Sequence, residues 1–203
     1  MPANADRIAT IRTRIEDSAE VGRRLLADDA TLSVLAGVAG LVVDSLQAGG
    51  KVLFFGNGGS SADAQHLAAE LLGRFYHDRG ALPAIALTDN AAALTAIAND
   101  YEYAEVFARQ IAGLARRGDV AIGLSTSGES ENVVRAIALA RSLQVHTVAF
   151  TRSGKNSLAE AAEHCIAIPS TDTPRIQEGH MLLGHTLCEL VEQETMALDS
   201  SEA

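Results

Sequence analysis

Short apolar runs alternate with segments of helical periodicity over residues 51–168, and this alternation constrains the fold more than any other feature of the chain. The runs have the length of β-strands and are apolar almost throughout, as strands are when both faces of their sheet are covered. Alternating strands and helices of this kind predict an α/β protein with a doubly wound parallel sheet flanked by helices. The five predicted strands are 51–55, 84–87, 120–124, 147–150 and 165–168.

Helical segments precede the first strand and separate the others. Residues 5–49 carry Leu and Val at helical spacing, and Gly49-Gly50 ends this run as a C-terminal cap would. Asp28 or Asp29 could divide the run into two helices. The other predicted helices lie near 61–75, 90–97, 105–116, 130–143 and 157–162, and the last runs from about 174 to 196.

Two of the strand-to-helix loops are rich in glycine and hydroxyl side chains. Residues 56–61 read Gly-Asn-Gly-Gly-Ser-Ser, and residues 125–130 read Ser-Thr-Ser-Gly-Glu-Ser. Backbone N–H groups at a helix N-terminus, with hydroxyl groups beside them, can bind a dianion without a lysine. In a sheet of order 2-1-3-4-5, the strands before these loops are neighbours at the point where the order reverses, and ligands bind there. We therefore predict this strand order and a site for a phosphorylated small molecule.

Neither loop matches a common nucleotide-binding motif. Ser61 stands where the dinucleotide fingerprint needs its last glycine after Gly56 and Gly58, and no Gly-Lys-Ser/Thr sequence follows. Either loop alone could be a tight connection between a strand and a helix. Two such loops that converge on one switch point favour a phosphate site.

The length and charge of the chain limit its possible domain organisation and functions further. A chain of 203 residues predicts a single domain, with a helical segment over 1–49 and an α/β core with its last helix over 50–197. The net charge of −10 disfavours nucleic acid as a partner. No apolar stretch approaches the length that spans a bilayer, and residues 1–14 do not resemble a signal peptide. Cys165 and Cys188 lie in apolar segments, so we expect reduced thiols and a cytoplasmic location.

Two helices carry residues that could do chemistry. His66 and Glu70 are four residues apart, so they share one helix face and can contact the same ion or substrate. An exposed His–Glu pair without such a role would show the same spacing. The last helix offers further candidates, and spacing alone does not choose among them: Gln177, Glu178, His180 and His185.

Four stretches of the sequence resemble the sedoheptulose-7-phosphate isomerase (phosphoheptose isomerase) family of sugar isomerase (SIS) domains. They are GNGGSSADAQHLAAELLGRF over 56–75, AND over 98–100, GLSTSG over 123–128 and DTPRIQEGHMLLGH over 172–185. The similarity covers essentially the whole chain. It implies conversion of sedoheptulose 7-phosphate into D-glycero-D-manno-heptose 7-phosphate through an enediol, as the first step of nucleotide-activated heptose synthesis for surface polysaccharide.

The resemblance also implies a role for individual residues. Glu70 and His185 match the acid/base pair of the family. The family binds one zinc ion per subunit, and its zinc-binding residues are matched by His66, Glu70, Gln177 and His185. The substrate-binding positions are matched by Asn57, Gly58, Gly59, Ser60, Asp63, Glu70, Asn99, Asp100, Ser125, Thr126, Ser127, Ser130 and Gln177. The family implies a homotetramer with active sites at subunit interfaces, and the sequence leaves open which subunit supplies each residue.

Two other functions are compatible with the same scaffold. A related non-enzymatic protein, the initiator-associating protein of bacterial DNA replication, lacks the acidic residue and the histidine that match Glu70 and His185. This chain has both, which favours an enzyme over a non-catalytic adaptor or sugar-phosphate sensor. A third possibility is an isomerase that acts on a shorter ketose phosphate, such as a hexose or pentulose phosphate. The two roles that the resemblance implies for Glu70, metal ligand and base, conflict with each other, because a metal lowers the basicity of its ligands.

Overall fold

The computed structural model describes residues 4–202 and contains one sheet of five parallel strands. The strands are β1 (Val52–Gly56), β2 (Ala84–Ala86), β3 (Val120–Leu124), β4 (His146–Arg152) and β5 (His164–Ile168). Their order is β2-β1-β3-β4-β5, which confirms the predicted order. Gly56 at the end of β1 pairs with Leu124 at the end of β3. The glycine- and hydroxyl-rich loops that follow these strands therefore leave the sheet side by side.

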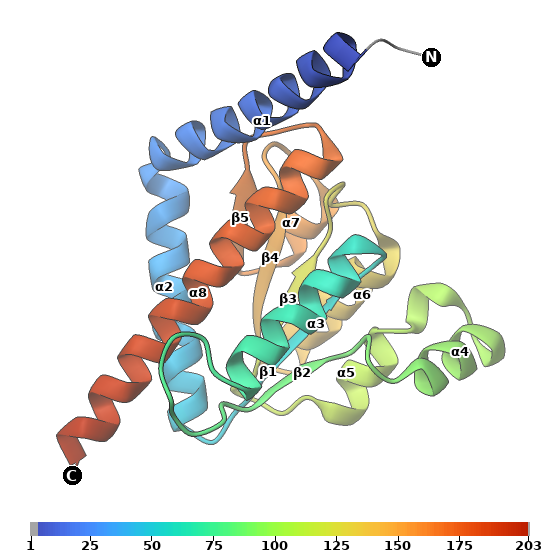
Figure 1. Cartoon of the computed structure of the whole chain (residues 1–203). Coiled ribbons are helices and arrows are strands. Elements are labelled where there is room, and N and C mark those ends of the chain that lie inside the picture. Colours follow the sequence, from blue (N-terminus) through green and yellow to red (C-terminus); the bar gives the residue numbers. More distant parts are fainter. Residues whose placement is uncertain (1–3, 203) are drawn as a thin grey trace.

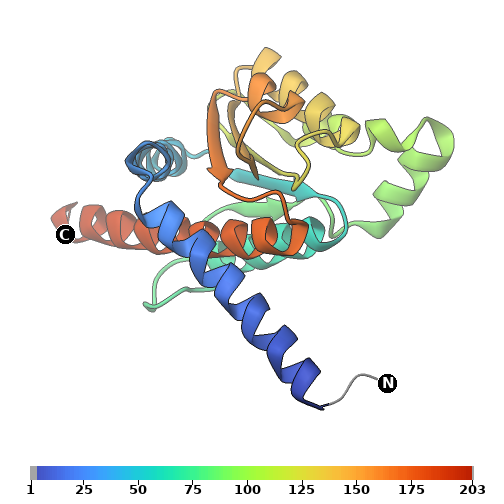
Figure 2. The same ribbon diagram turned by 90° about the horizontal axis from the view of Figure 1, so that it is seen from above.

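Helices cover both faces of the sheet (Figures 1 and 2). The helices are α1 (Asn4–Leu26), α2 (Asp29–Gln47), α3 (Gly59–Leu72), α4 (Ala91–Asp100), α5 (Ala108–Leu114), α6 (Glu131–Ser142), α7 (Ser157–Ala161) and α8 (Thr173–Glu202), with a 3-10 turn η1 (Tyr103–Glu105). Helices α2, α3 and α8 form one layer, and α5, α6 and α7 form the other. Helix α1 crosses α8 and projects from the body of the molecule (Figure 2).

Each layer encloses its own apolar core. Successive side chains of a strand point to opposite faces of the sheet, so Phe54 joins the core under α2, α3 and α8 while Phe55 joins the core under α5, α6 and α7. Phe150 lies in the first core and Phe107 in the second. All four aromatic side chains are at most 1% exposed.

The N-terminal helical run is divided where the sequence suggested. Asp28 is the N-cap of α2 and accepts hydrogen bonds from the Thr31 N–H at 3.1 Å and the Thr31 hydroxyl at 2.8 Å. Gly49, just past the end of α2, has a φ of 80°, as expected for a glycine that ends a helix.

Several predicted helix boundaries were wrong: α3 ends at Leu72 and not near 75, and α4 continues to Asp100 and does not stop near 97. The last helix does not stop near residue 196 but continues to Glu202, because no Gly or Pro follows Met196 to end it. Within the helix predicted over 105–116, only Ala108–Leu114 is α-helical; the turn η1 precedes it up to Glu105, and the backbone becomes extended at Ala115 with ψ of 147°.

The expectation about apolar stretches also needs a correction. Helix α2 has a mean hydropathy of 1.5 over a membrane-length window, so by length and composition alone it could cross a bilayer. In this fold it packs against α8 and β5, and its side chains Leu35, Val38 and Val42 are at most 3% exposed. Helix α2 is therefore a core helix.

Candidate active site

The loop after β3 is a cluster of hydroxyl groups at the N-terminus of α6. The Ser125 hydroxyl lies 2.9 Å from that of Ser130 and 3.3 Å from that of Ser127. The same hydroxyl accepts from the Gly128 N–H at 3.1 Å, and the Ser127 hydroxyl accepts from the Glu129 N–H at 3.1 Å. These N–H and O–H groups are the donors that an oxyanion needs, and Thr126 in the same loop is half-buried.

A network of side chains joins this loop to the one after β1. Asn57 and Asn132 exchange two amide hydrogen bonds of 2.8 and 2.9 Å, and the Tyr103 hydroxyl donates to Asn57 Oδ1 at 2.9 Å. Asn57 Oδ1 thus accepts from two donors, and one amide N–H of Asn57 is left for a ligand. The sequence reasoning missed Asn132 and Tyr103, although Asn132 directly follows the second loop in the first turn of α6.

Two further predicted substrate-binding residues end α4. Asn99 donates to the Asp100 carboxylate at 2.8 Å, and both side chains are exposed. Helix α4 contacts η1, which carries Tyr103 to Asn57. Asn99 and Asp100 therefore lie on a segment that is attached to the first loop.

The predicted residues Gly58, Gly59, Ser60 and Asp63 occupy the start of α3, where it approaches α8. A Cβ atom on Gly59 would lie 2.3 Å from the Gln177 amide nitrogen, so the Gln177 side chain could not keep its present position beside a larger residue. Gln177 donates to Asp63 at 3.3 Å, and burial raises the pKa of the Asp63 carboxyl. Ser60 is 6% exposed and its N–H donates to the Asn57 carbonyl.

His66, Glu70 and His185 form a compact cluster farther along the same two helices. His66 Nε2 lies 2.8 Å from His185 Nε2 and 3.2 Å from Glu70 Oε1. The His66 side chain is 48% exposed and that of Glu70 is 23% exposed, so a ligand can reach both. The cluster forms because α3 and α8 pack closely, and a Cβ on Gly184 would lie 2.8 Å from Leu67.

The donor set of this cluster fits a metal ion. Its three ligand atoms lie within 4.8 Å of one another, and two imidazole nitrogens with one carboxylate oxygen are the ligands of many catalytic zinc sites, which keep a fourth position open. The two histidine Nε2 atoms lie 2.8 Å apart, so both could contact one bound cation. The residues present can therefore hold a divalent ion.

The structure does not bring Gln177 to this cluster. Gln177 and His185 are eight residues apart on α8, about 12 Å along the helix axis, and the Gln177 amide points to Asp63. The other two candidates of α8 also lie outside the cluster: His180 is fully buried with its ring 5.9 Å from that of Phe150, and Glu178 pairs with an arginine of its own helix.

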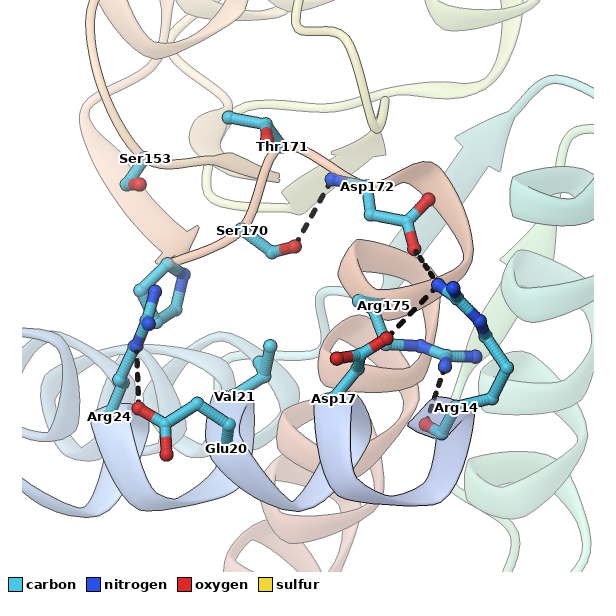
Figure 3. Close-up of a pocket in the computed structure, with 11 residues that line it drawn as sticks. Arg14, Asp17, Glu20, Val21, Arg24, Ser153, Ser170, Thr171, Asp172 and Arg175 are labelled. Carbon is cyan, nitrogen blue, oxygen red and sulfur yellow. Dashed lines mark hydrogen bonds and ion pairs between the residues drawn. The ribbon is translucent and has the colours of Figure 1, made fainter. Parts of the chain in front are cut away.

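A cavity of about 720 Å³ lies elsewhere, between α1 and the segment that joins β5 to α8 (Figure 3). Arg14 pairs with Asp17 at 3.0 Å, and Arg24 pairs with Glu20 at 3.0 Å. Arg14 also lies 4.0 Å from Asp172, and Arg175 donates to the Arg14 carbonyl at 2.7 Å, so the arginines of this cavity are already paired. None of the residues predicted to bind substrate or metal lines it.

Comparison with known proteins agrees with these features. The family model for the SIS domain matches residues 10–152. A phosphoheptose isomerase of Thermodesulfovibrio yellowstonii is 48% identical over 90% of both chains, and one of Akkermansia muciniphila is 54% identical over 77% of this chain and 83% of its own. The solved phosphoheptose isomerase of Francisella tularensis has a TM-score of 0.86 at 34% identity, over 92% of this chain and 98% of its own. The chain therefore belongs to the phosphoheptose isomerase family of SIS-domain proteins.

Proposed function

We propose that this protein converts sedoheptulose 7-phosphate into D-glycero-D-manno-heptose 7-phosphate, the first step towards a nucleotide-activated heptose. The observation that carries the proposal is the contact of His66, Glu70 and His185. It gives a sugar isomerase the proton acceptor and donor that its reaction needs, on a scaffold whose loops suit a sugar phosphate.

Interconversion of an aldose and a ketose moves one proton between C1 and C2 and another between the oxygens on these carbons. The carbon acid is weak, so a positioned base must remove its proton while the enediolate charge is stabilised. Glu70 and His185 are the groups proposed for this work. Glu70 contacts His66 through Oε1, and a carboxylate has a second oxygen that can accept a proton while the first is occupied.

His66, Glu70 and His185 would hold the zinc ion that the family implies. When bound, the ion supplies an electrophile that polarises the oxygens at C1 and C2. The rings of His66 and His185 meet in a T-shaped arrangement with their centroids 5.0 Å apart, and this contact holds the Nε2 atoms of both rings at the cluster.

The substrate phosphate is proposed to bind the loop over 125–130. Its oxygens would replace the hydroxyl groups that now accept from the N–H groups of Gly128 and Glu129. The dipole of α6 favours a negative charge at this end of the helix. Asn57, held by its oxygen, would donate its remaining N–H to a sugar oxygen.

The separation of loop and cluster supports a site shared between subunits of a homotetramer. Glu70 lies eleven residues after Gly59, about 16 Å along the axis of α3, so the acid/base pair is set back from the strand-end loops of the same protomer. We place the loop of one protomer opposite the cluster of another. Gln177, beside Gly59 at the end of the loop after β1, would then complete the metal site of the second copy. The cytoplasm is the proposed location, where sugar phosphates are made.

The test is a direct assay of the purified protein with sedoheptulose 7-phosphate, with the aldose product identified by chromatography and mass. Conversion to a heptose 7-phosphate is the expected result, and Glu70→Gln should slow it by about 10²–10⁴-fold. Binding of the sugar phosphate without turnover by the metal-loaded wild type would instead support a sensor. Faster turnover of a pentulose or hexulose phosphate would move the proposal to a shorter substrate.

A further inference from the structure

A buried carboxylate from α8 holds the segment that follows α3. Glu192 accepts hydrogen bonds from the backbone N–H groups of Phe75 at 2.9 Å, Tyr76 at 2.8 Å and His77 at 3.0 Å. Its side chain is only 1% exposed. Three consecutive backbone donors on one carboxylate leave this segment little freedom to move relative to α8.

Arg79 completes the arrangement from the other side. Its Nε donates to Glu192 at 3.1 Å, and its two terminal nitrogens donate to the carbonyls of Glu70 and Leu71 at 2.9 Å each. These carbonyls belong to the last turn of α3, where a helix leaves its acceptors unpaired. Arg79 therefore joins the end of α3 to α8 through Glu192.

Arg79 and Glu192 connect the two helices at the places that carry the proposed acid/base pair, Glu70 on α3 and His185 on α8. Arg79 bonds the backbone of Glu70 itself, and Glu192 lies seven residues, two turns, after His185 on the same face of α8. The segment that Glu192 holds also places the Phe75 ring 5.7 Å from the His185 ring, at 34° between their planes. The Arg79–Glu192 ion pair therefore contacts the backbone of Glu70 and holds the segment that places Phe75 beside His185.

We propose that Arg79 and Glu192 are positioning residues of the isomerase site, which fix Glu70 on α3 against His185 on α8 and set the His185 ring through Phe75. The inference rests on the proposed function of Glu70 and His185. No covalent step involves either residue. Their role is to hold the donor atoms of the cluster within the narrow range that metal binding and proton transfer require.

The chemistry of the pair suits this role better than a general stabilising one. A buried ion pair is weak evidence for stability, because desolvation offsets much of its attraction. The geometry here needs an acceptor for three N–H groups and a planar donor for several carbonyls, which only a carboxylate and a guanidinium supply. Burial alone would raise the pKa of Glu192, but the three N–H groups and Arg79 outweigh it and hold that pKa below its ordinary value.

A second buried ion pair provides a matched control. Asp119 is 2% exposed at its side chain and accepts from Lys51 Nζ at 2.5 Å. It also accepts from the backbone N–H groups of Lys51 at 3.0 Å and Arg116 at 2.8 Å. Lys51 and Arg116 lie on neither α3 nor α8. Asp119→Asn therefore disturbs a comparable pair that the proposed site does not use.

The experiment compares Glu192→Gln with Asp119→Asn at a temperature where circular dichroism shows both to be folded. We expect Glu192→Gln to lower kcat about 10–100-fold with KM nearly unchanged, since the phosphate loops stay intact. We also expect its affinity for Co²⁺, measured by competition with a chromogenic chelator, to fall about 10–100-fold. Asp119→Asn should lower the melting temperature but keep kcat and Co²⁺ affinity.

Phe75→Leu extends the test if Glu192→Gln fails to fold. It leaves the ion pair in place and removes only the ring beside His185, and we expect kcat to fall about tenfold. Unchanged kcat and Co²⁺ affinity in folded Glu192→Gln and in Phe75→Leu would overturn the proposal, as would an equal loss in Asp119→Asn. A wild type without isomerase activity would overturn the proposed function instead, while the Co²⁺ titration would still report on positioning.

Discussion

His66 and His185 are 119 residues apart in the chain, yet their Nε2 atoms lie 2.8 Å from each other. The contact depends on the packing of α3 against α8, which is close because Gly59 and Gly184 leave room at two levels of the helix pair. The site is therefore a property of one helix–helix interface. The loops on the sheet are proposed to bind the substrate phosphate, and this interface is proposed to carry the proton transfer.

Substitution of the acid/base pair should separate catalysis from folding. We expect Glu70→Gln and His185→Gln each to lower kcat by about 10²–10⁴-fold, because each replaces a proton carrier by an amide that does not titrate. Both side chains are partly exposed, so the melting temperature of the metal-free protein should change little. Steady-state assays with sedoheptulose 7-phosphate check this. Turnover near that of the wild type in either variant would remove that residue from the mechanism.

Metal binding to the cluster should be visible as stabilisation. An ion that binds only the folded protein raises the free energy of unfolding by about 2.7 kcal/mol at a concentration of 100 Kd. Thermal melts of the chelator-treated wild type should therefore shift upwards on addition of Zn²⁺. His66→Ala should lose the shift, and His77→Ala, which changes an exposed histidine outside the cluster, should keep it. An equal shift in both variants would place the ion elsewhere.

The sheet and both loops could be predicted from the sequence because their signals are local. Apolar runs identify strands, and the position of the loops at the switch point follows from strand order. The i, i+4 spacing of His66 and Glu70 likewise marks one helix face. The choice of His185 among the candidates of α8 came from the family resemblance, because periodicity cannot show which face of α8 meets α3.

What the sequence could not predict is the tertiary support of these residues. Asn132 and Tyr103 reach Asn57 across 75 and 46 positions, and Glu192 reaches Phe75 across 117. No local pattern marks a carboxylate that will be buried under three backbone N–H groups. Such contacts depend on how whole elements pack, so only the folded chain reveals them.

Removal of the hydrogen bonds that hold the Asn57 side chain should weaken substrate binding without affecting the acid/base pair. Asn132→Ala takes away two hydrogen bonds to Asn57, and Tyr103→Phe takes away one. At about 1 kcal/mol for a hydrogen bond, we expect KM to rise about fivefold in Tyr103→Phe and more in Asn132→Ala, with kcat nearly constant. A fall in kcat at constant KM would contradict this assignment.

The buried histidine of α8 should make the protein sensitive to acid. Burial lowers the pKa of His180 to about 4, so between pH 6.5 and 4 the unfolded chain binds a proton that the folded protein does not. The free energy of unfolding should therefore fall by up to about 3 kcal/mol as pH drops through this range. Denaturant melts at each pH, with a chelator present, would show this. His180→Leu should have a shallower pH dependence than His77→Gln; equal slopes would exclude His180 as the cause.

Mixing two inactive variants should test whether the active site is shared between protomers. Ser127→Asp puts a negative charge in the loop proposed to bind phosphate, and Glu70→Gln disables the acid/base pair, so each variant alone should be inactive. If loop and cluster come from different protomers, a co-refolded equal mixture regains sites in which an intact loop faces an intact cluster, about a quarter of the total. If one protomer supplies both, no site is intact and the mixture stays inactive. The double variant mixed with wild type provides the control, because it should dilute activity under either arrangement. Activity in the mixture would therefore place Glu70 of one copy opposite Ser127 of another, as the span of α3 between Gly59 and Glu70 suggests.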